Sequence, residues 1–258
     1  MDLGLRGRTA LVCASTGGLG RATAEALAAE GARVVISGRR AEMAEQLAAS
    51  LPDAVAAPCD VTTPGAAGEL VESARAALGA ELDIAVLNGP GPRPATATEI
   101  DADDLRAAME SLLVFQQSLV AQVLPGMRER RWGRILSVGS SGVLEPIGGL
   151  VLSNVGRSAL AAYVKSLASE VAADGVTVNM LLPGRIDTDR VQSLDAARAE
   201  REGRAPAEVA AAAATLIPAG RYGTPAEFGA VAAFLCSESA AYVTGSAVRC
   251  DGGMLHHL

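Results

Sequence analysis

Short apolar segments alternate with alanine-rich helical segments along almost the whole chain. Residues 8–15 (RTALVCAS) are mostly apolar, and residues 20–31 then carry a helical pattern that Gly31 ends. Further apolar segments occur at 33–38, 54–61, 82–89, 133–140, 175–184 and 246–253. Apolar strands that alternate with helices are typical of a parallel sheet that is covered on both faces. The sequence therefore predicts an α/β fold with a doubly wound parallel sheet of about seven strands and helices on both faces.

The chain has 258 residues and contains no linker, repeat or low-complexity segment that would divide it. A chain of this length can bury one large core. Because only 3% of the residues are aromatic, that core has to be built from Ala, Val, Leu and Ile. We therefore predict a single domain over residues 1–258.

Residues 190–216 interrupt the alternation. The segment is helical in propensity, is charged in its first half, and follows the end of the predicted sixth strand. Ligands of open parallel sheets bind at the carboxyl ends of the strands, where connecting loops usually carry the site. We predict that the segment is a substrate lid, and the alternative is a solvated surface excursion.

Composition and charge exclude several classes of function. The formal net charge is −7 and no basic block is present, which argues against nucleic acid as a partner. No apolar run approaches the roughly 18 residues of a membrane span, and the N-terminus shows no signal-peptide pattern. The four cysteines form no CxxC pair, so reduced thiols are expected and a metal site is not: Cys13, Cys59, Cys236 and Cys250. We therefore predict a cytoplasmic protein with no membrane contact.

A glycine-rich turn connects the first strand and the first helix. Residues 13–24 read CASTGGLGRATA, with Gly17, Gly18 and Gly20 in the turn and the first helical residues. Such a turn lets backbone N–H groups approach a pyrophosphate at the positive end of a helix. Its place after a buried strand predicts a Rossmann-type dinucleotide site, formed by Ser15, Gly17, Gly18, Leu19 and Gly20.

The end of the second strand indicates which dinucleotide binds. An acidic residue there would hold the ribose 2′-hydroxyl of NAD, but the chain reads ISGRR, so Gly38 leaves space and Arg39 and Arg40 bring positive charge. The planar fork of arginine suits a 2′-phosphate. We therefore predict NADP(H) as the cofactor, with NAD(H) as the alternative and a solvated arginine as the structural explanation.

Two further strand ends reach the same edge of the sheet. Asp60 and Val61 end the predicted third strand, where Asp60 could accept a hydrogen bond from an adenine amino group or could cap a helix. Asn88 and Gly89 end the fourth strand, where Asn88 could instead form a turn. We include all four residues in the predicted cofactor site.

The motifs resemble those of the short-chain dehydrogenase/reductase family, and the resemblance covers essentially the whole chain. The C-terminal segment 220–253 (GRYGTPAEFGAVAAFLCSESAAYVTGSAVRCDGG) matches the family signature almost completely. The glycine motif is matched in part, because Cys13 and Ala14 replace its first pair. Within the family, the chain resembles 3-oxoacyl-acyl-carrier-protein reductases. The resemblance implies that the segment after the sixth strand also binds the cofactor, through Pro183, Gly184, Ile186 and Thr188.

The residues at the family's catalytic positions differ from the family pattern. Ser140 occupies the position of the family's serine, but Ser153 stands where the family has tyrosine, and Arg157 where it has lysine. The family's asparagine aligns with Leu112. The nearby Tyr163 and Lys165 have the wrong spacing, and we expect Tyr163 in the core or in an interface.

These replacements change the proton chemistry that the resemblance implies. Serine is a poor general acid and arginine cannot relay a proton, but two hydroxyls and a cation can still stabilise an oxyanion. We predict the catalytic residues Ser140, Ser153 and Arg157, with Glu145 as a proton donor only if it is buried. The predicted function is an NADP(H)-dependent oxidoreductase that reduces a carbonyl or oxidises an alcohol.

Two alternatives remain open at this point. The same two hydroxyls and cation could serve a lyase, isomerase or cyclase. Alternatively, the chain could be a regulatory nucleotide-binding protein without turnover. The resemblance also implies a homo-oligomer, either a tetramer or a dimer, that pairs the helices over 103–130 and 149–173. We predict a small-molecule substrate.

Overall fold

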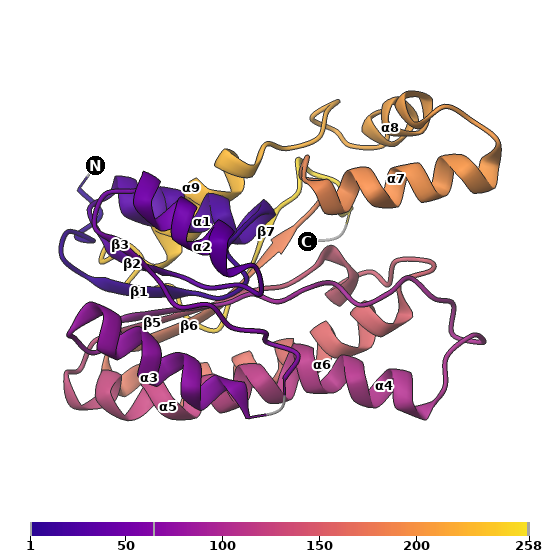
Figure 1. The fold of residues 1–258 in the computed structure, drawn as a ribbon. Coiled ribbons are helices and arrows are strands. Elements are labelled where there is room, and N and C mark those ends of the chain that lie inside the picture. Colours follow the sequence, from indigo (N-terminus) through magenta and orange to yellow (C-terminus); the bar gives the residue numbers. More distant parts are fainter. Residues whose placement is uncertain (1, 64, 257–258) are drawn as a thin grey trace.

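Seven parallel strands form one sheet in the computed structural model, which describes residues 2–63 and 65–256 (Figure 1). Their order across the sheet is β3-β2-β1-β4-β5-β6-β7. The strands are β1 (Thr9–Val12), β2 (Arg33–Ile36), β3 (Ala54–Ala56), β4 (Ile84–Leu87), β5 (Gly133–Val138), β6 (Val176–Pro183) and β7 (Ala247–Cys250). The predicted doubly wound parallel sheet is confirmed.

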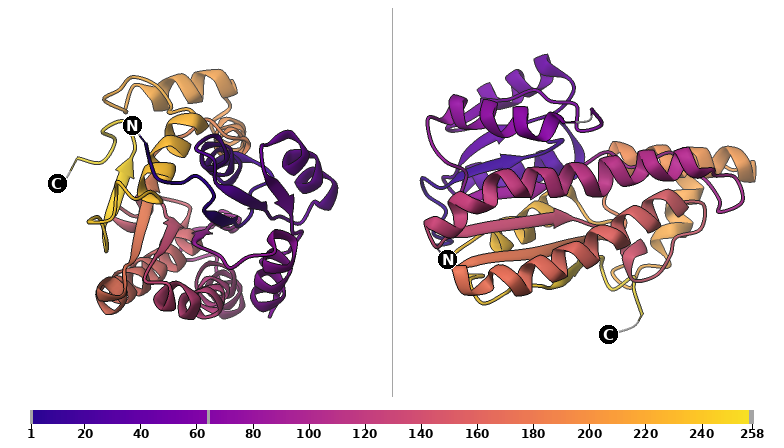
Figure 2. Two further views of the ribbon diagram at one scale, coloured as in Figure 1. Left: turned by 90° about the vertical axis from the view of Figure 1, so that its left-hand side faces the viewer. Right: turned by 90° about the horizontal axis from the view of Figure 1, so that it is seen from below.

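Helices cover both faces of the sheet (Figures 1 and 2). One face carries α1 (Gly18–Ala29), α2 (Ala41–Ser50) and α9 (Pro225–Leu235). The opposite face carries α3 (Ala66–Leu78), α4 (Ala102–Met109), the π-helical turn η1 (Glu110–Val114), α5 (Phe115–Glu129) and α6 (Val151–Val171). The helices α7 (Asp189–Glu202) and α8 (Pro206–Ala214) extend beyond the sheet at the carboxyl ends of the strands.

The two layers of core follow from the two-residue period of the strands. Successive side chains of a strand point to opposite faces of the sheet. Accordingly, Leu11 and Cys13 of the first strand segment pack toward α3, α5 and α6, while Ala10 and Val12 pack toward α1, α2 and α9. Both faces of every central strand are buried, which is why the strand segments are continuously apolar in sequence.

Helices α1 and α9 approach each other at Gly229. A Cβ atom at this position would lie 2.4 Å from the carbonyl oxygen of Ala22 in α1. We expect Gly229→Ala to lower the free energy of unfolding by about 1–3 kcal/mol, because backbone has to move. Urea denaturation measures the change. Gly68→Ala is the matched control, since nothing lies within 4 Å of the added atom in α3, and equal stability of the two variants would contradict the expectation.

Two predicted segments have different boundaries in the structure. The third strand ends at Ala56, and residues 59–61 lie in the loop beyond it, although the N–H groups of Ala57 and Cys59 still donate to the carbonyl oxygens of Ile36 (2.9 Å) and Gly38 (3.2 Å). The predicted helix over 103–130 is interrupted by the π-helical turn η1. Such turns are frequent at functional sites.

The combined helix Ala102–Glu129 is long and apolar enough to cross a membrane by length and composition, because it contains an 18-residue window with a mean hydropathy of 1.2. A buried core helix meets the same criterion, so one such helix is weak support for a span. Leu119, Val123 and Met127 of α5 are almost fully buried in the core beneath the sheet. We therefore interpret it as a core helix.

Candidate active site

The order of the strands reverses between β1 and β4, which is where open sheets bind ligands. The Asn88 side chain closes this point by donating a hydrogen bond from Nδ2 to the carbonyl oxygen of Ala14 (3.2 Å). A Cβ atom on Gly20 would lie 2.4 Å from that oxygen, so only glycine lets α1 start so close to β1. Ala14 adopts a left-handed conformation (φ +47°), and thus retains the turn although it lacks the family's glycine.

The amino terminus of α1 is free to bind an anion. Its N-cap residue is Gly17, and no side chain caps the first turn. The uncapped N–H groups and the helix dipole together form the kind of site that binds phosphate. This part of the predicted cofactor site therefore has the right donors.

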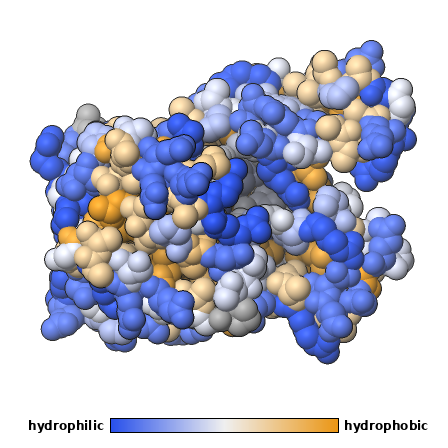
Figure 3. Space-filling model, in the orientation of Figure 1, coloured by the Kyte–Doolittle hydropathy of each residue, from blue (hydrophilic) through white to orange (hydrophobic). Residues whose placement is uncertain are grey.

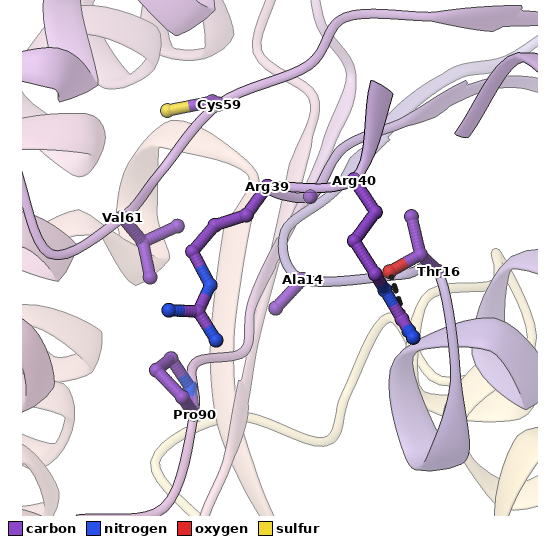
Figure 4. Close-up of a pocket in the computed structure, with 8 residues that line it drawn as sticks. Ala14, Thr16, Arg39, Arg40, Cys59, Val61 and Pro90 are labelled. Atoms are coloured by element: carbon purple, nitrogen blue, oxygen red, sulfur yellow. Dashed lines mark hydrogen bonds between the residues drawn. The ribbon is translucent and has the colours of Figure 1, made fainter. Parts of the chain in front are cut away.

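A pocket of about 420 Å³ lies beside the glycine turn (Figure 4). Figure 4 shows the Arg39 side chain between Val61 and Pro90, and Arg40 next to Thr16, to whose Oγ1 its Nη2 donates (3.4 Å). Both guanidinium groups are exposed, and neither forms an ion pair within residues 2–63 and 65–256. Two cations, a hydroxyl and an uncapped helix fit a dinucleotide that carries a 2′-phosphate.

Ser15, which we predicted in the cofactor site, faces away from the pocket. Ser15 is fully buried, and its hydroxyl donates to the carbonyl oxygen of Val12 (2.7 Å) and accepts from the N–H group of Ser37 (2.9 Å). It therefore ties β1 to β2. The neighbouring Thr16 lines the pocket in its place.

Asp60 makes a local turn and not the helix cap that was its structural alternative, because the N-cap of α3 is Gly65. Its Oδ1 accepts hydrogen bonds from the N–H group (3.0 Å) and the hydroxyl (2.7 Å) of Thr62. The hydroxyl bond is the main reason why the pKa of Asp60 lies below its usual value. Cys59 and Val61, on either side, line the pocket.

The segment after β6 folds back over the glycine turn. Thr188 caps α7 by accepting from the Val191 N–H group (3.4 Å), and its Cγ2 lies 3.8 Å from a Cβ atom built on Gly18. Pro183 is the last residue of β6, and Gly184 is pressed against Asp251, so close that a Cβ would come within 2.6 Å of the Asp251 Cα. Ile186 points into the core, with 3% of its surface exposed, so only its backbone can face a ligand.

The three predicted catalytic residues occupy adjacent elements. Ser140 follows β5 and its Oγ accepts from the N–H group of Gly142 (3.0 Å), so its proton remains free to be donated. Ser153 and Arg157 lie one turn apart on α6. The half-buried Ser153 hydroxyl has no hydrogen-bond partner within the described ranges. Arg157 donates from Nη1 to the carbonyl oxygen of Val138 at the end of β5.

Leu112 occupies the position of the family's asparagine and fills the space there with an apolar side chain. It lies in the π-helical turn η1, is 1% exposed, and packs against α6 at Gly156. A Cβ atom on Gly156 would lie 2.6 Å from Leu112 Cδ1. An apolar contact directly before Arg157 therefore occupies the place of a polar group.

Two nearby residues can be set aside. Tyr163 packs against the core beneath the sheet, and Lys165 donates to the carbonyl oxygen of Gly245 (3.1 Å).

Glu145 is exposed, so the burial that a proton-donor role required is missing. The described residues contain no cluster of potential metal ligands, and we assign no metal site.

The predicted lid segment forms α7 and α8, which project above the carboxyl edge of the sheet (Figure 1). In Figure 3 the surface is hollowed between this pair and the end of the molecule that carries α4 and α6. The buried Asp195 anchors α7 to the rest of the protein. Its carboxylate accepts hydrogen bonds from Arg185 Nη1 (2.6 Å) and from the Tyr222 hydroxyl (2.7 Å). The lid function itself stays a prediction.

We expect Tyr222→Phe to destabilise the packing of α7, because the change removes one of the hydrogen bonds to Asp195. The change leaves one oxygen of the buried Asp195 without its donor, at a cost of about 1–3 kcal/mol. Hydrogen exchange of the α7 amides, followed by mass spectrometry, should accelerate. Tyr242→Phe is the control because Tyr242 is fully exposed. Equal exchange in the two variants would show that the hydrogen bond from Tyr222 to Asp195 does not stabilise α7.

Several residues of the site were not predicted from the sequence. Thr16 and Pro90 line the pocket beside Arg39 and Arg40. Gln116 of α5 is 1% exposed, and its Oε1 is buried without a hydrogen-bond partner among the described residues; its Nε2 lies beside Gly89. A buried polar residue in a helix whose other buried positions are mostly apolar was the available signal for Gln116.

Comparison with known proteins assigns the class. Residues 13–255 match a family model described as Enoyl-(Acyl carrier protein) reductase. The 3-oxoacyl-(acyl-carrier-protein) reductase FabG of Escherichia coli is 32% identical over 253 residues, which cover 98% of this chain and 99% of that protein. The chain belongs to the short-chain dehydrogenase/reductase family of oxidoreductases, and the resemblance to 3-oxoacyl-acyl-carrier-protein reductases is confirmed.

Solved structures show the same fold with a nicotinamide coenzyme. L-sorbose reductase from Gluconobacter frateurii, complexed with NADPH and L-sorbose, is 32% identical with a TM-score of 0.94 and covers 100% of both chains. A 3-oxoacyl-(acyl-carrier-protein) reductase from Agrobacterium tumefaciens with NADP bound is 33% identical with a TM-score of 0.87 and covers 97% of this chain and 95% of that one. The coenzyme in both structures agrees with the predicted preference.

Proposed function

We propose that the protein is an NADP(H)-dependent carbonyl reductase, or an alcohol dehydrogenase in the reverse direction. The observation that carries the proposal is the pocket at the carboxyl edge of the sheet, where Arg39, Arg40 and Thr16 stand beside the uncapped amino terminus of α1. Their donors match the 2′-phosphate and the pyrophosphate. NADP-bound relatives of the same fold support this cofactor.

In the proposed reaction Ser140 and Ser153 hold the substrate oxygen, and the positive charge of Arg157 lies one helical turn from Ser153. NADPH, when bound, supplies the hydride. The two hydroxyls can donate hydrogen bonds to the developing oxyanion, and the buried guanidinium stabilises its negative charge. Because serine is a weak acid and arginine keeps its protons, the proton for the product alcohol comes from water or from the substrate.

Two measurements test the proposal. Fluorescence titration should show NADPH binding more tightly than NADH, and NADPH absorbance should fall with some member of a panel of 3-oxoacyl thioesters, quinones and small ketones. Absence of binding at millimolar nucleotide would end the proposal. Binding of NADPH without oxidation by any carbonyl would instead favour the non-redox or regulatory alternatives.

We also propose a cytoplasmic homo-oligomer, a tetramer or a dimer, that associates through the outer faces of the η1–α5 and α6 helices. Val114 and Val155 expose 43% and 42% of their surfaces on these elements. Light scattering coupled to size exclusion measures the mass, and a pure monomer would contradict this proposal.

A further inference from the structure

Arg157 is a buried cation without a counterion. Only 8% of its surface is exposed, and its Nη1 donates to the carbonyl oxygen of Val138. Among the residues that the structure describes, no carboxylate forms an ion pair with it. A buried charge is costly unless it is paired, so an anion from outside the chain would offset this cost.

A second guanidinium group, that of Arg190 in α7, lies at the loop that follows β4, and β4 is the neighbour of β5, at whose end Arg157 is bound. Arg190 Nη2 donates to the carbonyl oxygen of Pro92 (2.8 Å), in the loop that follows β4, and its Nε lies 3.2 Å from a Cβ atom built on Gly91. Arg190 also lacks an ion pair with any described residue. Burial, together with the positive charge of Arg190, lowers the pKa of Arg157 to about 10. The charged neighbour of Arg157 is therefore another cation.

We propose that Arg157 and Arg190 together bind the carboxylate of the substrate, so that the enzyme acts on oxo acids rather than on neutral ketones. This inference rests on the proposed carbonyl reductase function. A guanidinium group presents several donors in one plane, which match the two oxygens of a carboxylate. Arg157 uses one donor on Val138, and its others remain for the ligand.

The spacing on α6 limits the length of the substrate. Residues four apart on a helix have Cβ atoms about 5–6 Å apart, so a carbonyl held at Ser153 lies close to a carboxylate held at Arg157. Such a separation suits 2-oxo and 3-oxo acids. The pair also stands next to the ends of β4 and β5, whereas the phosphate donors Arg39 and Arg40 follow β2, on the other side of β1.

Calorimetric titration of the NADP⁺-loaded protein tests the inference without turnover. The probes are pyruvate and acetoacetate, each against its methyl ester. We expect the carboxylates to bind at least tenfold more tightly than the esters, and Arg190→Gln to weaken carboxylate binding by about 10- to 100-fold while the esters are unaffected. Arg198→Gln is the control, because Arg198 lies on the same helix but pairs with Glu202 (2.5 Å).

Each other outcome overturns the inference. Equal binding of acids and esters, no carboxylate binding to wild type, or an unchanged Arg190→Gln variant would show that the pair does not hold a substrate carboxylate. A parallel titration with NADP⁺ separates the sources of the anion: an equal loss of coenzyme affinity in Arg190→Gln would assign Arg190 to the coenzyme. If NADP⁺ itself does not bind, the proposed function fails, and the same acids titrated into the unloaded protein test the arginine pair alone.

Discussion

Replacing Arg39 and Arg40 together with alanine is expected to weaken NADPH binding by about 100-fold or more and to leave NADH binding nearly unchanged. Both guanidinium groups lie in the pocket beside Thr16, and neither has an ion pair among residues 2–63 and 65–256. Each substitution would remove a hydrogen bond from arginine to the charged 2′-phosphate. Fluorescence titration with the two nucleotides measures the change in preference.

A matched control separates this effect from the loss of positive charge. Arg128→Ala removes an exposed arginine that pairs with Asp174 (2.6 Å) at the end of α5, which precedes β5 and so lies at the amino edge of the sheet. Its NADPH affinity should equal that of wild type. Unaltered affinity in the double variant would mean that Arg39 and Arg40 are surface residues and that the 2′-phosphate lies elsewhere.

The double variant Ser153→Tyr with Arg157→Lys is expected to raise the reduction of neutral ketones by about 100- to 10,000-fold, the range that a general acid contributes. The variant restores a phenol whose pKa is lowered by a nearby ammonium group. Neutral ketones are the appropriate substrates, because the change also removes the guanidinium that we propose for carboxylates. NADPH oxidation measures the rate.

The control for this variant places the same ring elsewhere on α6. Ser158→Tyr adds a tyrosine at an exposed position next to Arg157, and we expect it to leave the rate unchanged. Leu112→Asn can be added to the double variant to test the missing polar group at Gly156. Wild-type rates in a folded, NADPH-binding double variant would show that the reaction does not occur at Ser153.

Much of the fold was predictable because buried parallel strands leave continuous apolar segments. All seven strands occur where such segments predict them. The third strand is shorter than predicted, since apolar character continues past Ala56 although regular pairing with β2 does not. The π-helical turn in the long helix was not predictable, because its residues are equally acceptable in an α-helix.

Residues of the candidate site were predictable only where the end of a single strand determines their position. The glycine turn and Arg39 follow directly from the strands before them. The turn conformation at Ala14 decides whether Ser15 or Thr16 faces the pocket, and a one-residue difference of this kind has no signal in composition. Arg190 reaches Pro92 only because α7 lies across the loop after β4, a long-range arrangement that no local pattern records.

The contact between Thr188 and Gly18 has a kinetic consequence. The threonine that starts α7 rests on the turn that would cradle the pyrophosphate, so filling that turn immobilises the base of the arm that carries Arg190. We therefore expect substrate capture to depend on prior nucleotide occupancy, which corresponds to compulsory-order addition with the dinucleotide as the first reactant to enter and the last product to leave.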